Sequence, residues 1–302
     1  MTNTEKPSIG FIGLGLMGSA IVEHLQSLGY PMTDIAHRKR AAIEAAVERG
    51  AKEVNTPGEL AQASNVVMLC VDTSAAVEAN MYGPNGVIEN VHSNTLVIDF
   101  GTSLPHSTQR IEADLKEKGC SMMDAPLGRT PSHALEGKLN IMSAGAQADF
   151  DRAKPLFEDL GENIFHIGPI GAGHTLKLIN NFIAMTTACA MSEAFAMADL
   201  AGLDRQTLYD VMASGPLHSG MMDWVKAEAI HGIPDQLAFS ITNGRKDVGY
   251  SSSMADDLGA PSFISPATKH AMTLAKISGW GDKMVPEMVD FITETYAEKH
   301  SK

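Results

Sequence analysis

Short apolar runs alternate with amphipathic segments along the first half of the chain. The runs at residues 8–13, 34–36, 65–71, 95–100 and 121–126 are typical of buried strands. Between them, segments such as residues 17–28 and 39–49 place apolar side chains at helical spacing. This alternation predicts βαβ units, and therefore a parallel sheet with helices on both faces. Two later runs, residues 139–145 and 162–168, are expected to continue that sheet to about Gly168.

The second half of the chain has a helical pattern. Residues 174–201 are rich in Ala, Met and Leu and contain neither Pro nor Gly, so they predict one long helix. Further helical stretches follow, separated by Gly, Pro and Ser clusters at residues 214–216, 232–234 and 259–266. We therefore expect an α/β domain at residues 1–170 and an all-helical domain at residues 171–302, with the long helix between them.

Composition and charge exclude some classes of partner. The chain has 302 residues, of which 44% are hydrophobic and 20% charged, as in an ordinary globular protein. Its 36 acidic and 23 basic residues give a net charge of −13, so we expect no nucleic acid or anionic membrane as a partner. The odd number of three cysteines favours a reduced, cytoplasmic protein, and the polar residues 1–7 predict no secretory signal. No cluster of His, Asp, Glu and Cys has metal-ligand spacing, so no metal is expected.

The first apolar run ends in a glycine motif, GFIGLGLMG, with the spacing G-x-G-x-x-G. Gly13 permits a tight turn, Gly15 lets the backbone approach a pyrophosphate, and Gly18 allows close packing of helix on strand. The alternative is a glycine-rich turn without function, but a position between a strand and a helix at the head of a βαβ series favours a dinucleotide site. The residues expected to bind the cofactor here are Gly13, Leu14, Gly15, Leu16, Met17 and Gly18.

The end of the second predicted strand bears on the choice of cofactor. An acidic residue at this place binds the ribose 2′-hydroxyl of NAD, whereas this chain has the basic run AHRKR at residues 36–40. His37, Arg38 and Lys39 are therefore expected to bind a 2′-phosphate, which favours NADP over NAD. The alternative is a solvated helix start, where basic residues are common.

The segment GPIGAGHTLKLINNF places Lys177 and Asn181 four residues apart, which puts both side chains on one face of a helix. A lysine on an apolar helix loses solvation, and this suits it to donate and accept a proton near neutral pH. Asn181 could fix a substrate oxygen or orient the lysine. The alternative is a lysine that reaches solvent beside a core amide.

Four segments together resemble a known family. GFIGLGLMG, DAPLGRT, GPIGAGHTLKLINN and GRKDVGYSSSMA occur in the order and spacing of the β-hydroxyacid dehydrogenases, over nearly the whole chain. The resemblance implies a Rossmann domain, a long interdomain helix, an all-α domain, and hydride exchange between a nicotinamide cofactor and a short 3-hydroxy acid or its aldehyde. A non-catalytic dinucleotide-binding protein on the same fold is the alternative from another class.

The resemblance also implies roles for single residues. Lys177 matches the family's catalytic lysine and Asn181 the amide that supports it. Asp247 is expected to hold the local structure beside a lysine that contacts the cofactor. Contacts to the cofactor, or to nicotinamide and substrate together, are implied for Val71, Asp72, Thr102 and Lys246.

One loop departs from the family pattern D-A-P-V-S-G-G, in which serine and glycine bind the substrate carboxylate. Here the last three positions are Gly128, Arg129 and Thr130. An arginine fork fits a carboxylate or a sulfonate, so we expect Arg129 to bind the acid group of a small anionic aldehyde or hydroxy acid. The residues expected to bind substrate are Thr102, Gly128, Arg129, Thr130, Lys177, Asn180 and Asn181.

The G-R-T loop and the segment around Asn180 resemble those of the 3-sulfolactaldehyde reductases within the family. Reduction of succinic, methylmalonic or tartronic semialdehyde, each of which carries a carboxylate, is the alternative. The apolar long helix and the Met-rich helical half favour a homodimer or homotetramer.

Overall fold

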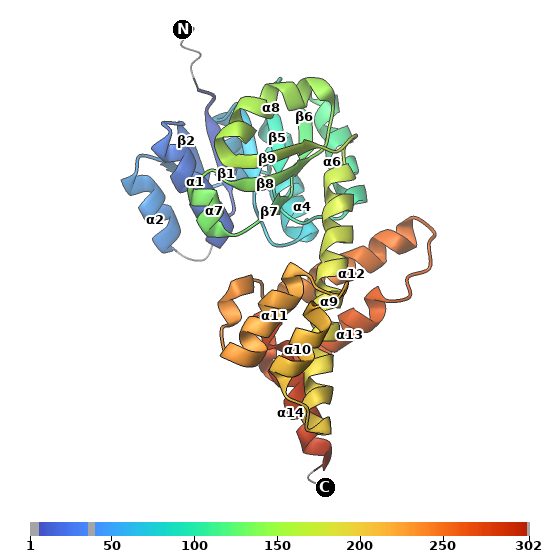
Figure 1. Cartoon of the computed structure of the whole chain (residues 1–302). Coiled ribbons are helices and arrows are strands. Elements are labelled where there is room, and N and C mark those ends of the chain that lie inside the picture. Colours follow the sequence, from blue (N-terminus) through green and yellow to red (C-terminus); the bar gives the residue numbers. More distant parts are fainter. Residues whose placement is uncertain (1–5, 36–39, 301–302) are drawn as a thin grey trace. The chain divides into compact units, whose positions relative to one another are not determined.

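The computed structural model describes residues 6–35 and 40–300, with the backbone alone for residues 298–300. The chain folds into two compact units, residues 1–177 and 178–302 (Figure 1). The division predicted after residue 170 stays a prediction. Each unit is described below by itself.

The first unit is built on a six-stranded parallel sheet with the order β3-β2-β1-β4-β5-β6. Its strands are β1 (Ile9–Ile12), β2 (Met32–Ile35), β3 (Lys52–Val54), β4 (Val66–Leu69), β5 (Leu96–Asp99) and β6 (Ser121–Asp124). The order changes direction between β1 and β4, as in a doubly wound Rossmann fold, so the predicted α/β class is confirmed. The short edge strand β3 was not predicted, because two of its three residues are polar and exposed.

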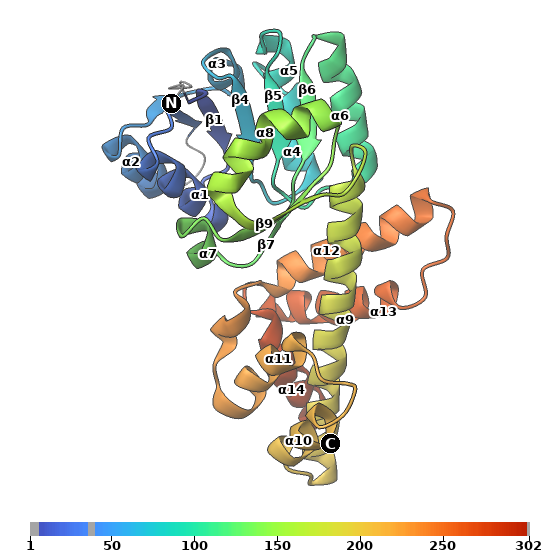
Figure 2. The ribbon, with the colours of Figure 1, turned by 45° about the horizontal axis from the view of Figure 1, so that its top comes forward.

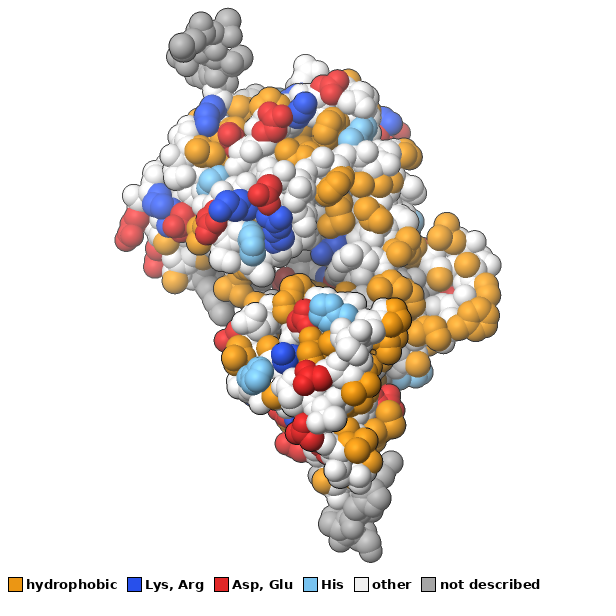
Figure 3. Space-filling view, viewed as in Figure 1, with side chains coloured by type: hydrophobic (Ala, Val, Ile, Leu, Met, Phe, Trp, Pro, Cys, Tyr) orange, Lys and Arg blue, Asp and Glu red, His pale blue; other side chains and the backbone are white. Residues whose placement is uncertain are grey.

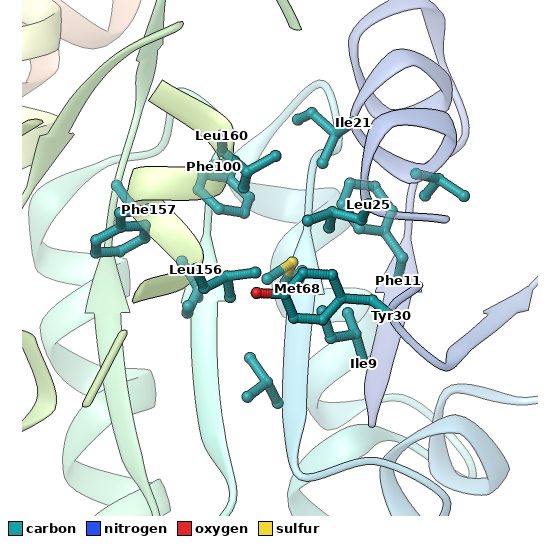
Figure 4. Packing of buried hydrophobic residues seen from close by; sticks show 14 of the residues in the cluster. Ile9, Phe11, Ile21, Leu25, Tyr30, Met68, Phe100, Leu156, Phe157 and Leu160 are labelled. Carbon is teal, nitrogen blue, oxygen red and sulfur yellow. The ribbon is translucent and has the colours of Figure 1, made fainter. Parts of the chain in front are cut away.

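Helices cover both faces of this sheet (Figure 2). One face packs on α1 (Leu16–Ser27), α2 (Arg40–Glu48) and α8 (Gln147–Leu160). The other packs on α3 (Pro57–Gln62), α4 (Ser74–Tyr82), α5 (Val87–Asn90) and α6 (Pro105–Glu117). In the first core, Phe11 of β1, Leu25 of α1 and Phe157 of α8 are fully buried, and Figure 4 shows them around the strands. This burial supplies most of the favourable free energy of folding for the unit.

A second sheet departs from the prediction. Residues 139–145 and 162–168 were expected to continue the main sheet, but β8 (Leu139–Ser143) and β9 (Gly161–His166) form a separate sheet with β7 (Leu127–Gly128). Pro126 has no N–H to donate and stands between β6 and β7, so the chain leaves the main sheet there. An isolated bridge between Asp124 and Ala144 joins the two sheets. Helix α7 (Pro131–Leu135) connects β7 to β8.

Helix α9 (Ala172–Ala201) has 30 residues, about 45 Å of helix at 1.5 Å per residue, and it continues from the first unit into the second. The prediction of one long helix is confirmed. Among the described residues, no helix combines the length and the apolar character that a membrane crossing requires.

The second unit is helical over its described residues, as predicted. Its core is formed by Met, Val and Phe side chains such as Met185, Phe195, Val248 and Met272. Besides the end of α9, its helices are α10 (Arg205–Ala213), α11 (Gly220–His231), η1 (Pro234–Leu237), α12 (Ile241–Asp257), α13 (Ser265–Ala275), η2 (Lys276–Trp280), η3 (Val285–Glu287) and α14 (Met288–His300).

Candidate functional site

The glycine motif forms the turn between β1 and α1, and each glycine has a different physical reason. Gly13 has φ +110°, and a Cβ there would collide with the backbone carbonyl oxygen of Cys70. A Cβ at Gly18 would collide with the carbonyl oxygen of Gly13. A Cβ at Gly15 would meet no atom of residues 6–35 or 40–300 within 4 Å. The fold itself therefore requires Gly13 and Gly18, whereas Gly15 faces open space.

The start of α1 suits a phosphate group. Gly15 is its N-cap, with no side-chain hydrogen bond to the cap and no acidic residue in the first turn. The first N–H groups of the helix and its positive dipole end are therefore available to an anion. Leu14 and Met17 pack against the core, and Leu16 is 82% exposed. These residues fit the pyrophosphate of a dinucleotide.

The basic corner is described only in part. His37, Arg38 and Lys39 lie outside the described residues. Arg40 begins α2 and binds Glu53 through two hydrogen bonds, Nη1 to Oε1 at 2.6 Å and Nη2 to Oε2 at 3.1 Å. The positive charge of Arg40 is thus already countered by a carboxylate.

Asp34 of β2 is a buried acid that the sequence analysis missed. Asp34 is 0% exposed, and neither carboxyl oxygen has a hydrogen-bond partner among the residues that the structure describes. Burial raises the pKa of Asp34 to about 7, and the charge of Arg49 opposes that rise. An acidic residue inside a short buried strand, between Thr33 and Ile35, was the available signal.

The loops after β4 and β5 begin at the edge of the sheet where the glycine turn also lies. Ile12 is in register with Leu69, and Leu69 with Asp99, so these strands end side by side. Val71 and Asp72 follow β4, and Thr102 follows β5. In a doubly wound sheet, the carboxyl edge at the change of strand order is where dinucleotides bind.

Thr102 is half-buried in a turn that Asp99 holds. One carboxylate oxygen of Asp99 accepts a hydrogen bond from the Gly101 N–H, and the other from the Ser103 hydroxyl, both at 2.8 Å. The buried side chain of Asp99 therefore fixes the backbone turn on both sides of Thr102.

Lys177 lies in the first unit, on α9, and reaches the loop that was predicted to bind substrate. Its Nζ donates a hydrogen bond to the backbone carbonyl of Leu127 at 2.7 Å. Leu127 immediately precedes Gly128, Arg129 and Thr130. The structure thus brings the predicted proton donor to the loop predicted to hold the acid group.

Arg129 adopts an unusual backbone conformation. Its φ is +77°, in the left-handed region that glycine adopts readily and other residues avoid. The glycine of the family pattern at this position is the residue that this conformation favours. An L-residue here costs about 1 kcal/mol.

The side chain of Arg129 extends along the small sheet. Its Nη1 donates to the carbonyl oxygen of Lys138 at 2.6 Å and lies 2.5 Å from a carboxylate oxygen of Glu162 on β9. The arginine is 27% exposed and the glutamate 53%. An acid group that bound Arg129 would therefore share the guanidinium with Glu162 or displace it.

The residues on either side of Arg129 have contacts of their own. A Cβ at Gly128 would lie 3.2 Å from the Cβ of Asn140, its partner in the sheet, so the pairing of β7 with β8 favours glycine. The Thr130 hydroxyl is within hydrogen-bond distance of Ser132 Oγ at 2.8 Å and of His133 Nδ1 at 2.7 Å.

In the second unit, Asn181 is held by the Arg-Lys-Asp segment of α12. Its amide nitrogen donates to Asp247 at 2.6 Å, and the other oxygen of Asp247 pairs with Lys246 at 2.9 Å. Asn180, which is exposed, donates to the Asn181 oxygen at 3.2 Å. Asp247 therefore orients the amide that was predicted to support Lys177.

Two protein-family models match the chain. Residues 8–168 match the model described as the NAD binding domain of 6-phosphogluconate dehydrogenase. Residues 171–292 match the model described as "NAD-binding of NADP-dependent 3-hydroxyisobutyrate dehydrogenase".

Individual proteins resemble the chain over most of its length. The 3-sulfolactaldehyde reductase of Escherichia coli is 28% identical over 91% of this chain and 92% of its own. The glyoxylate/succinic semialdehyde reductase 1 of Arabidopsis thaliana is 27% identical over 97% and 99%. A solved structure of Mycobacterium tuberculosis 3-hydroxyisobutyrate dehydrogenase with L-serine shares the fold, with a TM-score of 0.82 and 22% identity over 95% of this chain and 99% of its own. The chain therefore belongs to the β-hydroxyacid dehydrogenase family.

Proposed function

We propose that this NAD(P)-dependent oxidoreductase reduces a short aldehyde that carries an acid group, with 3-sulfolactaldehyde as the best candidate. The observation that carries the proposal is the hydrogen bond from Lys177 Nζ to the Leu127 carbonyl. It holds a proton donor against the loop of Arg129, where the family pattern binds the acid end of the substrate.

Lys177 acts as the general acid. A bound nicotinamide cofactor supplies the hydride. The Leu127 carbonyl can only accept a hydrogen bond, so it stabilises the protonated amine and directs its remaining N–H groups. Nζ then gives a proton to the oxygen of the substrate carbonyl as negative charge develops there. In the oxidation direction the neutral amine takes that proton back.

Arg129 binds the acid group. Its Nη1 is engaged by Glu162 and the Lys138 carbonyl, and its fork has further donors on Nε and Nη2 for an anion. The backbone around Gly128 and Thr130 assists, and Thr102 lines the nicotinamide and substrate. Asn180 and Asn181 complete the substrate contacts.

The acid group is either a sulfonate or a carboxylate. The fork of an arginine satisfies both, and relatives named for both kinds of substrate match this chain at nearly equal identity. The G-R-T sequence of the loop is what favours the sulfonate. Reduction of a carboxylate semialdehyde is the second candidate, favoured by the match to the Arabidopsis enzyme.

NADP is the proposed cofactor and NAD the alternative, on the basic charge of His37, Arg38 and Lys39. Contacts to it are proposed for the glycine turn, Val71, Asp72 and Lys246. Replacing Arg38 by Asp should lower the ratio of kcat/KM for NADPH to that for NADH. An unchanged ratio would show that these basic residues do not decide between NADP and NAD.

A cytoplasmic homodimer or homotetramer is the proposed state. Its support is exposed apolar surface in the second unit, where Leu258 is 72%, Phe263 81% and Ile264 54% exposed. Figure 3 shows hydrophobic side chains gathered over the end of the α12–α13 pair. Light scattering coupled to size-exclusion chromatography would give the mass directly.

A substrate screen tests the proposed function. NADPH and NADH are each offered with 3-sulfolactaldehyde and with succinic, methylmalonic and tartronic semialdehydes, and the loss of absorbance of the reduced cofactor is followed. We expect the highest kcat/KM with 3-sulfolactaldehyde and NADPH. A carboxylate aldehyde as the best substrate would move the assignment to the second candidate, and no turnover with any of them would refute the proposal.

A further inference from the structure

Four buried polar side chains meet in the first unit at the start of α9. They are Asp99, Thr108, Asp124 and His174, and each is at most 1% exposed. Polar groups at this depth are costly unless they are satisfied, so their arrangement calls for a physical reason. None of them belongs to the catalytic or binding residues proposed above.

Asp124, the last residue of β6, caps helix α9. Its two carboxylate oxygens accept hydrogen bonds from the backbone N–H groups of Gly171 and His174, both at 2.7 Å. These donors have no partner within the helix, because the first N–H groups of any helix lack one. Burial raises the pKa of Asp124, whereas the charge of His174 and the two N–H donors lower it. The cap fixes the position of the turn from which Lys177 follows.

Asp99, the last residue of β5, holds a second segment of the proposed site, the turn of Thr102, by accepting hydrogen bonds. It accepts hydrogen bonds from Gly101 and Ser103 on either side of Thr102. Because Asp99 and Asp124 are in register on neighbouring strands, their carboxylates lie at the same edge of the sheet.

His174 lies between the two aspartates. Its Nδ1 is within hydrogen-bond distance of the Thr108 hydroxyl at 2.8 Å. The two carboxylates lie just beyond hydrogen-bond distance, with Nε2 3.7 Å from Asp99 and Nδ1 3.8 Å from Asp124, so the ring packs between them. His174 is three residues before Lys177 on the same helix, so the two side chains lie on one face of α9.

We propose that Asp124, His174 and Asp99 are positioning residues, which hold the first turn of α9 and the turn of Thr102 in one fixed relation. The inference rests on the proposed function, because Lys177 and Thr102 are its proton donor and its nicotinamide-side hydroxyl. A misplacement of about 1 Å between reacting groups lowers a rate about 100-fold, so a rigid link between these two segments has a direct kinetic consequence.

The first test is the variant Asp124→Asn. It keeps the shape of the side chain but turns one acceptor into a donor that faces an N–H group. We expect kcat to fall about 100-fold while cofactor affinity changes little. The matched control is Asp204→Asn, which alters an aspartate cap of helix α10 in the second unit, where Asp204 accepts from the Thr207 N–H at 2.8 Å. The control should leave kcat within about twofold of the original enzyme.

A second readout does not depend on turnover. The reaction of Lys177 with formaldehyde and cyanoborohydride is measured against pH by peptide mass spectrometry. A negative charge at a helix start stabilises a nearby ammonium, so Asp124→Asn should move the midpoint of this reaction down by about half a pH unit. Asp204→Asn should not move it. An unmoved midpoint with a kcat equal to that of the control would overturn the proposal.

His174→Asn serves if Asp124→Asn does not fold. It keeps the backbone N–H that Asp124 caps and removes the imidazole that packs between Asp124 and Asp99, and we expect kcat to fall about tenfold. A kcat within twofold of the original would count against the network. If the original enzyme reduces none of the aldehyde acids, the proposed function fails, yet the labelling of Lys177 still decides whether Asp124 sets its environment.

Discussion

Replacing Arg129 by Gly separates two roles of this residue. The variant restores the glycine of the family pattern and removes both contacts of the guanidinium, to Lys138 and to Glu162. It also removes the proposed contact to the acid group of the substrate. A stability measurement therefore reports the contacts of Arg129 within the protein, and a measurement of substrate affinity reports its proposed contact to the acid group.

The expected change in stability is small, because its contributions oppose one another. Relief of the left-handed conformation contributes about 1 kcal/mol. Loss of an ion pair that is 27% and 53% exposed costs about 0.5 kcal/mol, loss of the carbonyl hydrogen bond about 1, and the added freedom of glycine in the unfolded chain about 0.5. The sum is about 1 kcal/mol of destabilisation, or a fall in Tm of about 4 °C at most.

Affinity for the substrate should change much more. A hydrogen bond to a charged group contributes about 1.5–3 kcal/mol, which corresponds to about 10- to 100-fold in binding. Glu162 already competes for the guanidinium, so we expect the change in binding to lie at the lower end of this range. KM for 3-sulfolactaldehyde should therefore rise about tenfold. An uncharged aldehyde of similar size, glyceraldehyde, should show a KM within about twofold of the original.

The assay follows reduced cofactor by absorbance at several concentrations of each aldehyde, beside a thermal unfolding curve. Glu162→Gln is the matched variant, since it removes the competing carboxylate and keeps Arg129; it should lower KM for the anionic aldehyde severalfold. Equal effects of Arg129→Gly on the charged and the uncharged aldehyde would refute the assignment of Arg129 as the anion site.

Two other predictions follow from the first unit. Gly15→Ala should leave Tm unchanged, because its Cβ meets no atom of the described residues, yet it should raise the Kd for NADPH at least tenfold by occupying the place proposed for the pyrophosphate. Gly220→Ala, equally open, is the control, and an unchanged Kd for Gly15→Ala would contradict the site. The pKa of Asp34 rises from 3.8 to about 7 on folding, so its contribution to stability is fully present below about pH 4 and is lost as pH rises through about 7. Asp34→Asn should therefore gain stability relative to the original protein between pH 5 and pH 8 in urea unfolding, by at most about 3 kcal/mol. Parallel pH curves would show that the carboxyl is not buried as described.

The parts of the fold that depend on local pattern could be predicted from the sequence. The five main strands and the long helix follow from apolar periodicity and from the absence of Pro and Gly in residues 174–201. The small sheet could not, because its strands resemble those of the main sheet in pattern, and only the position of Pro126 and the pairing partners distinguish them.

The candidate site was predictable where it is carried by motifs. Gly13 and Gly18 form the turn between β1 and α1 that the glycine motif predicts, and Lys177 lies on α9, while its role in catalysis stays a prediction. The pairing of Arg129 with Glu162 was not predictable, because it joins residues far apart in sequence across β8, at a register shift beside Leu139. The buried contacts of Asp99 and Asp124 were missed for the same reason, since each looks in the sequence like the polar end of a strand.

The most direct test of the account is the variant Lys177→Ala. Turnover of 3-sulfolactaldehyde, or of whichever aldehyde acid the screen identifies, is measured under saturating NADPH, together with NADPH binding by fluorescence titration. Loss of a general acid predicts a kcat lower by about 100- to 10,000-fold, with the Kd for NADPH within about threefold of the original. A variant that binds NADPH normally and keeps most of its kcat would show that Lys177 is not the proton donor.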